Sequence, residues 1–347
     1  MEIACCTTTT RLSRLLAILA FAGAFTIFAA CGSGSTSIRP TGGGDRFLLA
    51  NQAGLNEATA NGTIRNLVKF DDASYVLDPA ISPDGHKIAF ARQTPARNLP
   101  NGSVDFGSDL YVTDRDGQNV KEVLHHSAIA EFIRSPAWLS ATELLITVQG
   151  QAADRSADFR TERLDVTTGT RKRLINGAIN AGLSRDQKQL VYVAVDPVTQ
   201  EETLIETDLA LTFRRTLADG TSGLGLFSSA VFSPDGKSVT FAAVDLNAPA
   251  LSPTPTPGAG GALKSGYAAA ALHPFAQDVW SVNGDGSGLR RLSEIAENNP
   301  SLTWSGDGLR LFALGPTAFW RIDAATGKAD HVGSGIPLGQ ILWLAPK

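Results

Sequence analysis

A hairpin motif that recurs along the chain constrains its fold more than any other feature. One copy is "AVFSPDGKSVTF" at 230–241, which places a Pro-Asp-Gly turn between an apolar run and a β-branched run. The same arrangement recurs in "PAISPDGHKIAF" at 79–90, and a variant of it is found in "LTWSGDGLRLF" at 302–312. Proline fixes φ at the first corner of a turn, aspartate bonds to nearby backbone, and glycine accepts positive φ. Each copy therefore predicts a β-hairpin, and their repetition predicts a repeat architecture.

Aligning the residue before each turn gives six anchors along the chain: Ile81, Trp138, Leu183, Phe232, Trp304 and Trp343. Each of the first five anchors precedes three further β-rich segments separated by turn signals, which is typical of a four-stranded propeller blade. The second strands are continuous apolar runs, as in strands buried on both faces, and the third strands alternate more. The fourth strands carry Arg and Lys, which suits a solvated outer edge.

The sixth copy supplies only a first strand before the chain stops at Lys347. Its missing strands are found at the other end of the sequence, at 46–50, 55–59 and 64–67. Because pairing the two ends matches edges that would otherwise be open, we predict an all-β fold over residues 46–347. It is a six-bladed β-propeller of four-stranded antiparallel blades, with the last blade closed by both termini.

"ISPDGHKIAF" followed by "DLYVTDRDGQNVKEVL" resembles the propeller repeat of the TolB family, which combines a Ser-Pro-Asp-Gly turn with an Asp-x-Asp-Gly turn. The resemblance is clear in the first, fourth and fifth copies and degenerate in "WLSATE" and "LSRDQK". It implies a propeller located in the cell envelope. TolB itself also has an N-terminal α/β domain, and the stretch between Cys31 and the first strand is too short for one. We therefore expect a TolB-like propeller outside the Tol system.

Residues 1–30 are expected to be a lipoprotein signal peptide. Two arginines precede "LLAILAFAGAFTIFAAC", an apolar run as long as a signal-peptide core and short for a spanning helix. "FAAC" resembles a bacterial lipoprotein signal, which implies acylation of Cys31, although Phe28 stands where an aliphatic residue is usual. An ordinary secretory signal is the alternative. Residues 31–45 then form a flexible Gly/Ser-rich tether, and the mature chain keeps too few cysteines for an intrachain disulfide.

No sequence pattern assigns catalytic, metal-binding or cofactor-binding residues. Gly-x-Ser-x-Gly does not occur, and no Gly-rich phosphate loop precedes a helix. The Asp-Gly turns at 114–117 and 283–286 lack the ligands of an EF-type calcium loop, so we interpret them as turns. Adjacent residues on a strand point to opposite faces, and in a loop they rarely share a metal ion, so His125 and His126 are not expected to bind one together. The net charge of −4 excludes a nucleic-acid footprint.

Long loops are expected to gather on one face, because second-to-third-strand loops and blade crossovers open on the same side of a propeller. The insertions fall at 94–108, at 149–157 and above all at 245–277, which is rich in Pro and Ala. Binding function is often carried by such loops. We therefore expect a monomeric, lipid-anchored, non-catalytic envelope scaffold that binds another envelope protein or a cell-wall-associated component. The alternatives are an enzyme of lyase or cyclase type with a site in the central channel, and a small-molecule sensing module.

Overall fold

The computed structural model describes residues 44–344 apart from 53, 60–62, 101, 153–155 and 249–275. The expected signal peptide, nearly all of the tether and most of the 245–277 insertion lie outside the described residues. The described part belongs to one compact unit. Apart from the short 3-10 helix η1 (Gly220–Ser222), its regular elements are all β-strands. The all-β prediction is confirmed.

The strands pair in antiparallel groups of four, as the blade pattern predicts. Sheet 1 contains β4 (Tyr75–Ile81), β5 (Lys87–Gln93), β8 (Gly107–Asp114) and β9 (Lys121–Leu124), and sheet 2 contains β10 (Glu131–Trp138), β11 (Glu143–Gln151), β12 (Ala157–Asp165) and β13 (Arg171–Asn176). Sheet 3 contains β14 (Ala178–Leu183), β15 (Gln189–Val195), β16 (Glu202–Asp208) and β17 (Arg214–Asp219).

Three further groups complete the fold. Sheet 4 contains β18 (Leu224–Phe232), β19 (Ser238–Asp245), β20 (Gln277–Asn283) and β21 (Arg290–Glu297), and sheet 5 contains β22 (Ser301–Trp304), β23 (Arg310–Leu314), β24 (Ala318–Asp323) and β25 (Ala329–Ser334). The terminal sheet has the order β26 (Gln340–Leu344), β1 (Arg46–Asn51), β2 (Gly54–Thr59) and β3 (Ile64–Val68). A separate two-stranded hairpin joins β6 (Arg97–Asn98) to β7 (Val104–Asp105).

Sheets 1 and 2 are joined by a short parallel pairing that the sequence did not predict. Glu131 and Phe132 of β10 pair with Gly107 and Ser108 of β8, which makes one eight-stranded sheet. A Cβ atom on Gly107 would lie 2.4 Å from the carbonyl oxygen of Glu131. Because real Cβ atoms do not approach so closely, glycine permits the two strands to meet here.

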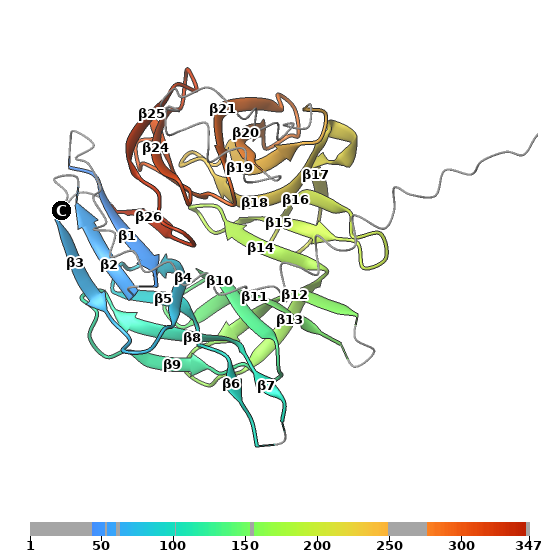
Figure 1. Cartoon of the computed structure of the whole chain (residues 1–347). Helices are drawn as coiled ribbons and strands as arrows, with labels where there is room; N and C mark the ends of the chain where they lie inside the picture. Colours follow the sequence, from blue (N-terminus) through green and yellow to red (C-terminus); the bar gives the residue numbers. More distant parts are fainter. Residues whose placement is uncertain are drawn as a thin grey trace, which may run out of the picture. The chain divides into compact units, whose positions relative to one another are not determined.

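The first strands of the sheets lie nearest the common centre around which the sheets stand side by side (Figure 1). They touch in sequence: β4 contacts β10, β10 contacts β14, β14 contacts β18, β18 contacts β22, β22 contacts β26, and β26 contacts β4. The apolar core is divided among the seams between neighbouring sheets. Phe47, Phe312 and Phe319, for example, pack edge-on between sheet 5 and the terminal sheet.

The predicted turns have the expected hydrogen bonds. In the first turn the Ser82 hydroxyl donates to Asp84 and accepts from the Lys87 N–H, and the same arrangement recurs at Ser184, Ser233 and Ser305. The degenerate "LSRDQK" copy therefore keeps the turn, with Gln187 at a φ of 60° where other copies have glycine. The aspartates of these motifs therefore form hydrogen bonds that hold the turns.

Burial follows the strand order as expected for the second and fourth strands. The second strands are buried along most of their length, and the fourth strands begin with exposed or half-buried residues. The third strands depart from the prediction in the terminal sheet, where β2 is buried almost throughout, and in sheet 1, where β8 is buried almost throughout rather than alternating. Strand β8 is covered on one side by the seam with the terminal sheet and on the other by sheet 2.

Candidate functional site

The connections at the two ends of the strands differ in length. First-to-second-strand turns are short and alike, at 82–86, 139–142, 184–188, 233–237 and 305–309. Second-to-third-strand loops vary widely, at 94–106, 152–156, 196–201, 246–276 and 315–317. Since antiparallel strands reverse direction at every turn, these variable loops and the crossovers between sheets share one side. We call this side the long-loop face.

The β6–β7 hairpin is the described part of the long-loop face that extends farthest from its own sheet (Figure 1). It lies within the 94–106 loop, and Arg97 and Asp105 pair across it at 2.8 Å. The sequence predicts an insertion here but does not indicate a hairpin. Its four strand residues carry no alternation of apolar and polar side chains that would have predicted one.

The first strands carry a set of polar residues, one on each strand, three positions before the anchor residue that was aligned in the repeats. Its members are Asp78, Ser135, Asn180, Ser229, Ser301 and Gln340. The first four have φ values of 48–54° and lie at bulges in their strands. Positive φ is uncommon outside glycine and is a form of backbone strain that collects at functional or structurally constrained positions. We call this set the inner polar ring.

The inner polar ring links neighbouring sheets through side-chain hydrogen bonds. Gln340 of β26 accepts from the Asp78 N–H of β4, and Asp78 in turn accepts from the Ser135 N–H of β10 at 2.9 Å. Ser301 of β22 accepts from the N–H of Ile341 at 3.1 Å. The ring therefore serves first to fasten adjacent sheets.

Asp78, the charged member of this ring, forms an ion pair with Arg134 of β10. Nε of Arg134 lies 2.5 Å from Oδ2 of Asp78, and the two side chains are 25% and 14% exposed. Burial works to raise the pKa of Asp78, but the Arg134 guanidinium and the Ser135 N–H outweigh it and hold that pKa below its usual range. The carboxylate is therefore ionised and its oxygens are engaged, which leaves it poorly suited to proton transfer.

Carboxylates accept backbone hydrogen bonds near the long-loop face, within sheet 4 and at the crossover before β10. Asp278 accepts from the N–H groups of Ile295 and Ala296 at 3.0 and 3.1 Å. Glu131 accepts from the N–H and the hydroxyl of Ser127, and these bonds, with the Arg160 guanidinium, hold the pKa of this glutamate below its usual range against the effect of burial. Each carboxylate thus gives a partner to backbone N–H groups that have left the regular strand pairing.

One crossover carries two histidines beside such a carboxylate. The Asp109 Oδ1 atom lies 2.6 Å from Nδ1 of His126 and 3.0 Å from Nδ1 of His125. The ring centroids of the two histidines are 4.5 Å apart. The two imidazoles do not point to opposite faces as they would on a strand, because they lie in the irregular crossover after β9. Burial opposes protonation of His126, but its contacts with Asp109 and Asp105 raise its pKa.

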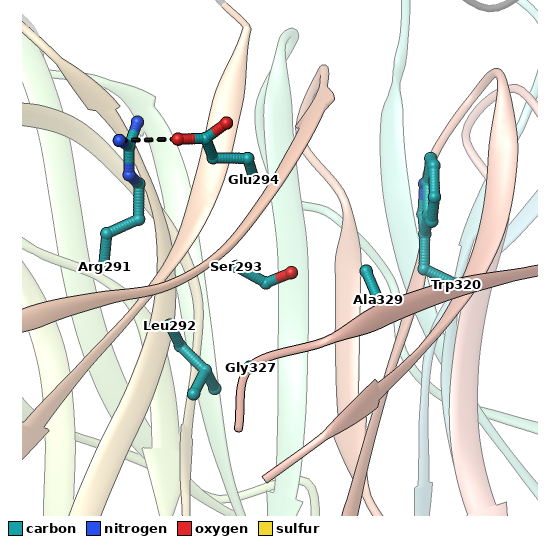
Figure 2. Close-up of a pocket in the computed structure, with 7 residues that line it drawn as sticks. All are labelled: Arg291, Leu292, Ser293, Glu294, Trp320, Gly327 and Ala329. Carbon is teal, nitrogen blue, oxygen red and sulfur yellow. Dashed lines mark ion pairs between the residues drawn. The ribbon is translucent and has the colours of Figure 1, made fainter. Parts of the chain in front are cut away.

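A shallow groove of about 400 Å³ lies between β21 and the β24–β25 hairpin. Figure 2 shows the Arg291–Glu294 ion pair on one wall and Trp320 on the other. A Cβ atom on Gly327 would lie 1.9 Å from the Leu292 carbonyl oxygen, so the two sheets are in direct contact at this seam. The groove is a gap along the outer edge of that seam.

Within the described residues, the other histidines and the arginine pairs of the fourth strands, Arg214–Arg215 and Arg290–Arg291, do not gather into one site. Cys31 and His273 lie outside the described residues. His86 lies in the first turn, and His331 packs against Trp320 at 5.5 Å. Of the arginine pairs, Arg215 bonds to Glu206 and to the Gly284 carbonyl, and Arg291 pairs with Asp278 and Glu294. Both arginines have carboxylate partners, as expected for outer strands.

Exposed apolar side chains are divided between the two faces. Val104, Ile129, Val198, Leu246 and Leu338 lie on the long-loop face, and Ile64, Val120, Leu211, Phe213 and Leu309 lie near the opposite face. Loop length, rather than apolar exposure, therefore distinguishes the faces. None of the helices in the described part of the chain is long and apolar enough to cross a membrane.

Solved structures share this arrangement of sheets. TolB from Acinetobacter baumannii matches at 12% identity and a TM-score of 0.57, covering 86% of this chain and 66% of its own. A putative TolB from Agrobacterium tumefaciens matches at 15% identity and a TM-score of 0.54, and the match covers 90% of this chain and 100% of its own. A chain of the nidogen–laminin complex matches at 12% identity and a TM-score of 0.59, and the match covers 88% of this chain and 100% of its own. No family model and no curated protein matches the sequence.

These similarities define the class of fold, which is a β-propeller. More particularly, the chain folds as a TolB-like propeller, as its turn motifs predicted. It spans just under two thirds of the A. baumannii TolB chain.

Proposed function

We propose that this chain is a lipid-anchored, extracytoplasmic propeller that acts as a non-catalytic protein-binding scaffold. Its long-loop face would bind another envelope protein or a cell-wall-associated component, with the chain acting as a monomer. The observation that carries the proposal is the contrast between the similar turns of one face and the divergent loops of the other. On a rigid scaffold, loops that vary in length and sequence are where binding residues are placed.

The proposal includes a closed ring of six blades in which the terminal sheet is the last blade. Support comes from β26, which pairs with β1 over five residue pairs from Arg46↔Leu344 to Ala50↔Gln340. The contacts of β26 with both β22 and β4 support it further, as do the hydrogen bonds from Asp78 to Gln340 and from Ile341 to Ser301. A closed ring holds the long-loop face rigid, which lowers the entropy lost on binding.

The pairing and the lowered pKa of the Asp78 carboxylate support the proposal that the chain is not catalytic. The Asp78 carboxylate is paired with Arg134 and with the Ser135 N–H. General acid–base catalysis requires a group whose pKa lies near the working pH and that reaches the substrate. A carboxylate with a lowered pKa and occupied oxygens meets neither condition.

Membrane attachment through Cys31 is proposed from the sequence. The cysteine follows an apolar signal-like run and precedes a Gly/Ser-rich stretch of about the length needed to separate a propeller from a bilayer surface. Residue 32 is glycine rather than aspartate, which favours the outer membrane by analogy with Gram-negative lipoproteins. The long-loop face would then be available to envelope partners.

Crosslinking in intact envelopes, followed by affinity purification and mass spectrometry, tests the binding proposal. Residues 97–105 are replaced by an Asn-Gly turn, which removes the β6–β7 hairpin, and Lys237→Glu on the opposite face serves as control because Lys237 is 85% exposed. We expect wild type and K237E to recover the same partner, and the hairpin variant to recover about tenfold less. Equal recovery by all three proteins would contradict binding through this part of the long-loop face.

A further inference from the structure

The crossover from β9 to β10 carries a cluster of nitrogen and oxygen ligands that the proposed function does not use. Its centre is Asp109, which is 2% exposed at the start of β8. One nitrogen of His125, one nitrogen of His126 and one oxygen of Asp109 lie within 4.8 Å of one another. In the described part of the chain this is the group of His, Cys, Asp and Glu side chains that could hold a metal ion.

The ring of His126 needs a positive charge, because both of its nitrogens face carboxylate oxygens. Its Nδ1 faces Oδ1 of Asp109 at 2.6 Å, and its Nε2 faces Oδ1 of Asp105 at 3.1 Å. A neutral imidazole carries one N–H, so one of these nitrogens would otherwise direct a lone pair at a carboxylate oxygen. Either a second proton or a metal ion between the nitrogen and the carboxylate removes this repulsion.

Asp105 holds His126 as the outer partner of a metal-ligating histidine does. Such histidines almost always donate their second ring nitrogen to a carboxylate or carbonyl, which fixes the tautomer and the ring orientation. With the proton on Nε2 toward Asp105, Nδ1 of His126 presents its lone pair to the centre of the cluster. Arg97 pairs with Asp105 at 2.8 Å and steadies that carboxylate.

The second histidine reaches the same point from the solvent side. Nδ1 of His125 lies 3.0 Å from Oδ1 of Asp109 and 3.4 Å from Oε1 of Glu122, and its side chain is 58% exposed. Ligand atoms of a tetrahedral zinc site stand about 3.4 Å apart. The two nitrogen–oxygen distances to Asp109 are 2.6 and 3.0 Å, so these atoms must move apart by about 0.8 and 0.4 Å to admit an ion.

A repeat-equivalent residue shows that holding the backbone at this position does not require histidine. Asp278 occupies in β20 the place of Asp109 in β8, and it accepts from the Ile295 and Ala296 N–H groups. Asp109 performs the same task by accepting from the His126 N–H at 2.8 Å. A carboxylate alone is therefore enough to bind the backbone here, and the two imidazoles and Asp105 are not needed for that task.

We propose that Asp109, His125 and His126 bind one divalent transition-metal ion of the zinc class, with Asp105 orienting His126. Two imidazoles and one carboxylate are a ligand set that zinc accepts, and the fourth position faces the exposed side, near Glu122. The ion would fasten the β6–β7 hairpin, through Asp105, to the β9–β10 crossover on the long-loop face. This inference stands apart from partner binding and is tested without a partner.

Isothermal titration of the full chain, purified without a polyhistidine tag and stripped with chelator, tests the site with Zn²⁺ alone. We expect one ion per chain, and His125→Ala should weaken binding by at least about tenfold. His86→Ala is the matched control, since His86 is an exposed histidine on the opposite face. Co²⁺ should give the visible spectrum of a tetrahedral nitrogen–oxygen site that H125A loses. No Zn²⁺ binding by the wild type, or equal binding by H125A and H86A, would overturn the proposal.

Discussion

Asp78 of β4 accepts a hydrogen bond of 2.5 Å from Nε of Arg134 in β10, and it thereby joins the first strands of sheets 1 and 2 by a mostly buried ion pair. Removing one partner of such a pair leaves an uncompensated charge away from water, which costs more than the pair itself contributes. The pair is therefore best tested by comparing single and double replacements.

Arg134→Met is expected to lower the free energy of unfolding by about 3 kcal/mol, because it leaves the Asp78 carboxylate without its counter-charge. The double variant D78N/R134M should recover most of this loss, since neither charge remains. Urea denaturation of both variants and wild type measures the effect. A double variant as unstable as R134M would show that packing, and not the unpaired charge, dominates.

Two turn glycines with similar backbone angles should respond differently to alanine. Gly85 and Gly117 have φ values of 75° and 90°, but a Cβ on Gly85 meets nothing within 4 Å, whereas one on Gly117 would lie 2.2 Å from the Leu67 carbonyl oxygen. Gly85→Ala should cost about 1 kcal/mol for the backbone alone. Gly117→Ala should cost about 3 kcal/mol or more, because β3 must move. Similar costs in thermal denaturation would mean that the seam with the terminal sheet is loose.

Glu57 should make the propeller acid-sensitive over a defined range. Burial works to raise its pKa, but hydrogen bonds and charge from Arg65 and Arg46 lower it from 4.5 to about 2. A lowered pKa contributes stability that is complete above the unfolded value and is lost as pH falls toward the folded value. Between pH 4.5 and 2 the wild-type melting temperature should fall more steeply than that of Glu57→Gln. Parallel pH profiles would contradict this role.

Lipid attachment should depend on Cys31 alone. Cys31→Ser is expected to abolish incorporation of a labelled fatty acid in cells, because the thiol is the acylated group. The double variant C5S/C6S is the matched control, since both cysteines lie in the segment that signal cleavage would remove. Label retained by C31S would show that the chain is not a lipoprotein anchored at this residue.

The blades were predictable because their turns have local causes. Pro, Asp and Gly set the backbone of each first turn, and the Ser82-type hydroxyl completes it, so strand positions follow from a few residues. The inner polar ring was missed, although a signal was present: a polar residue stands three positions before every anchor, from Asp78 to Gln340.

Other features of the candidate site depend on contacts between distant segments. The Asp109–His126 contact joins β8 to a crossover whose irregular path no periodicity reveals. The parallel pairing of β8 with β10 depends on the absence of a side chain at Gly107, which matters only once Glu131 is placed beside it. Sequence patterns report local backbone preference, and these contacts have no local signature.

Site-specific photo-crosslinking in intact envelopes tests binding through the long-loop face most directly. A benzophenone amino acid is placed at Val198 in the 196–201 loop or at Leu309 on the opposite face, because both side chains are well exposed, at 87% and 65%. The account predicts that irradiation gives a discrete adduct with one envelope partner from position 198 and none from position 309. An adduct from position 309 with none from position 198 would contradict it.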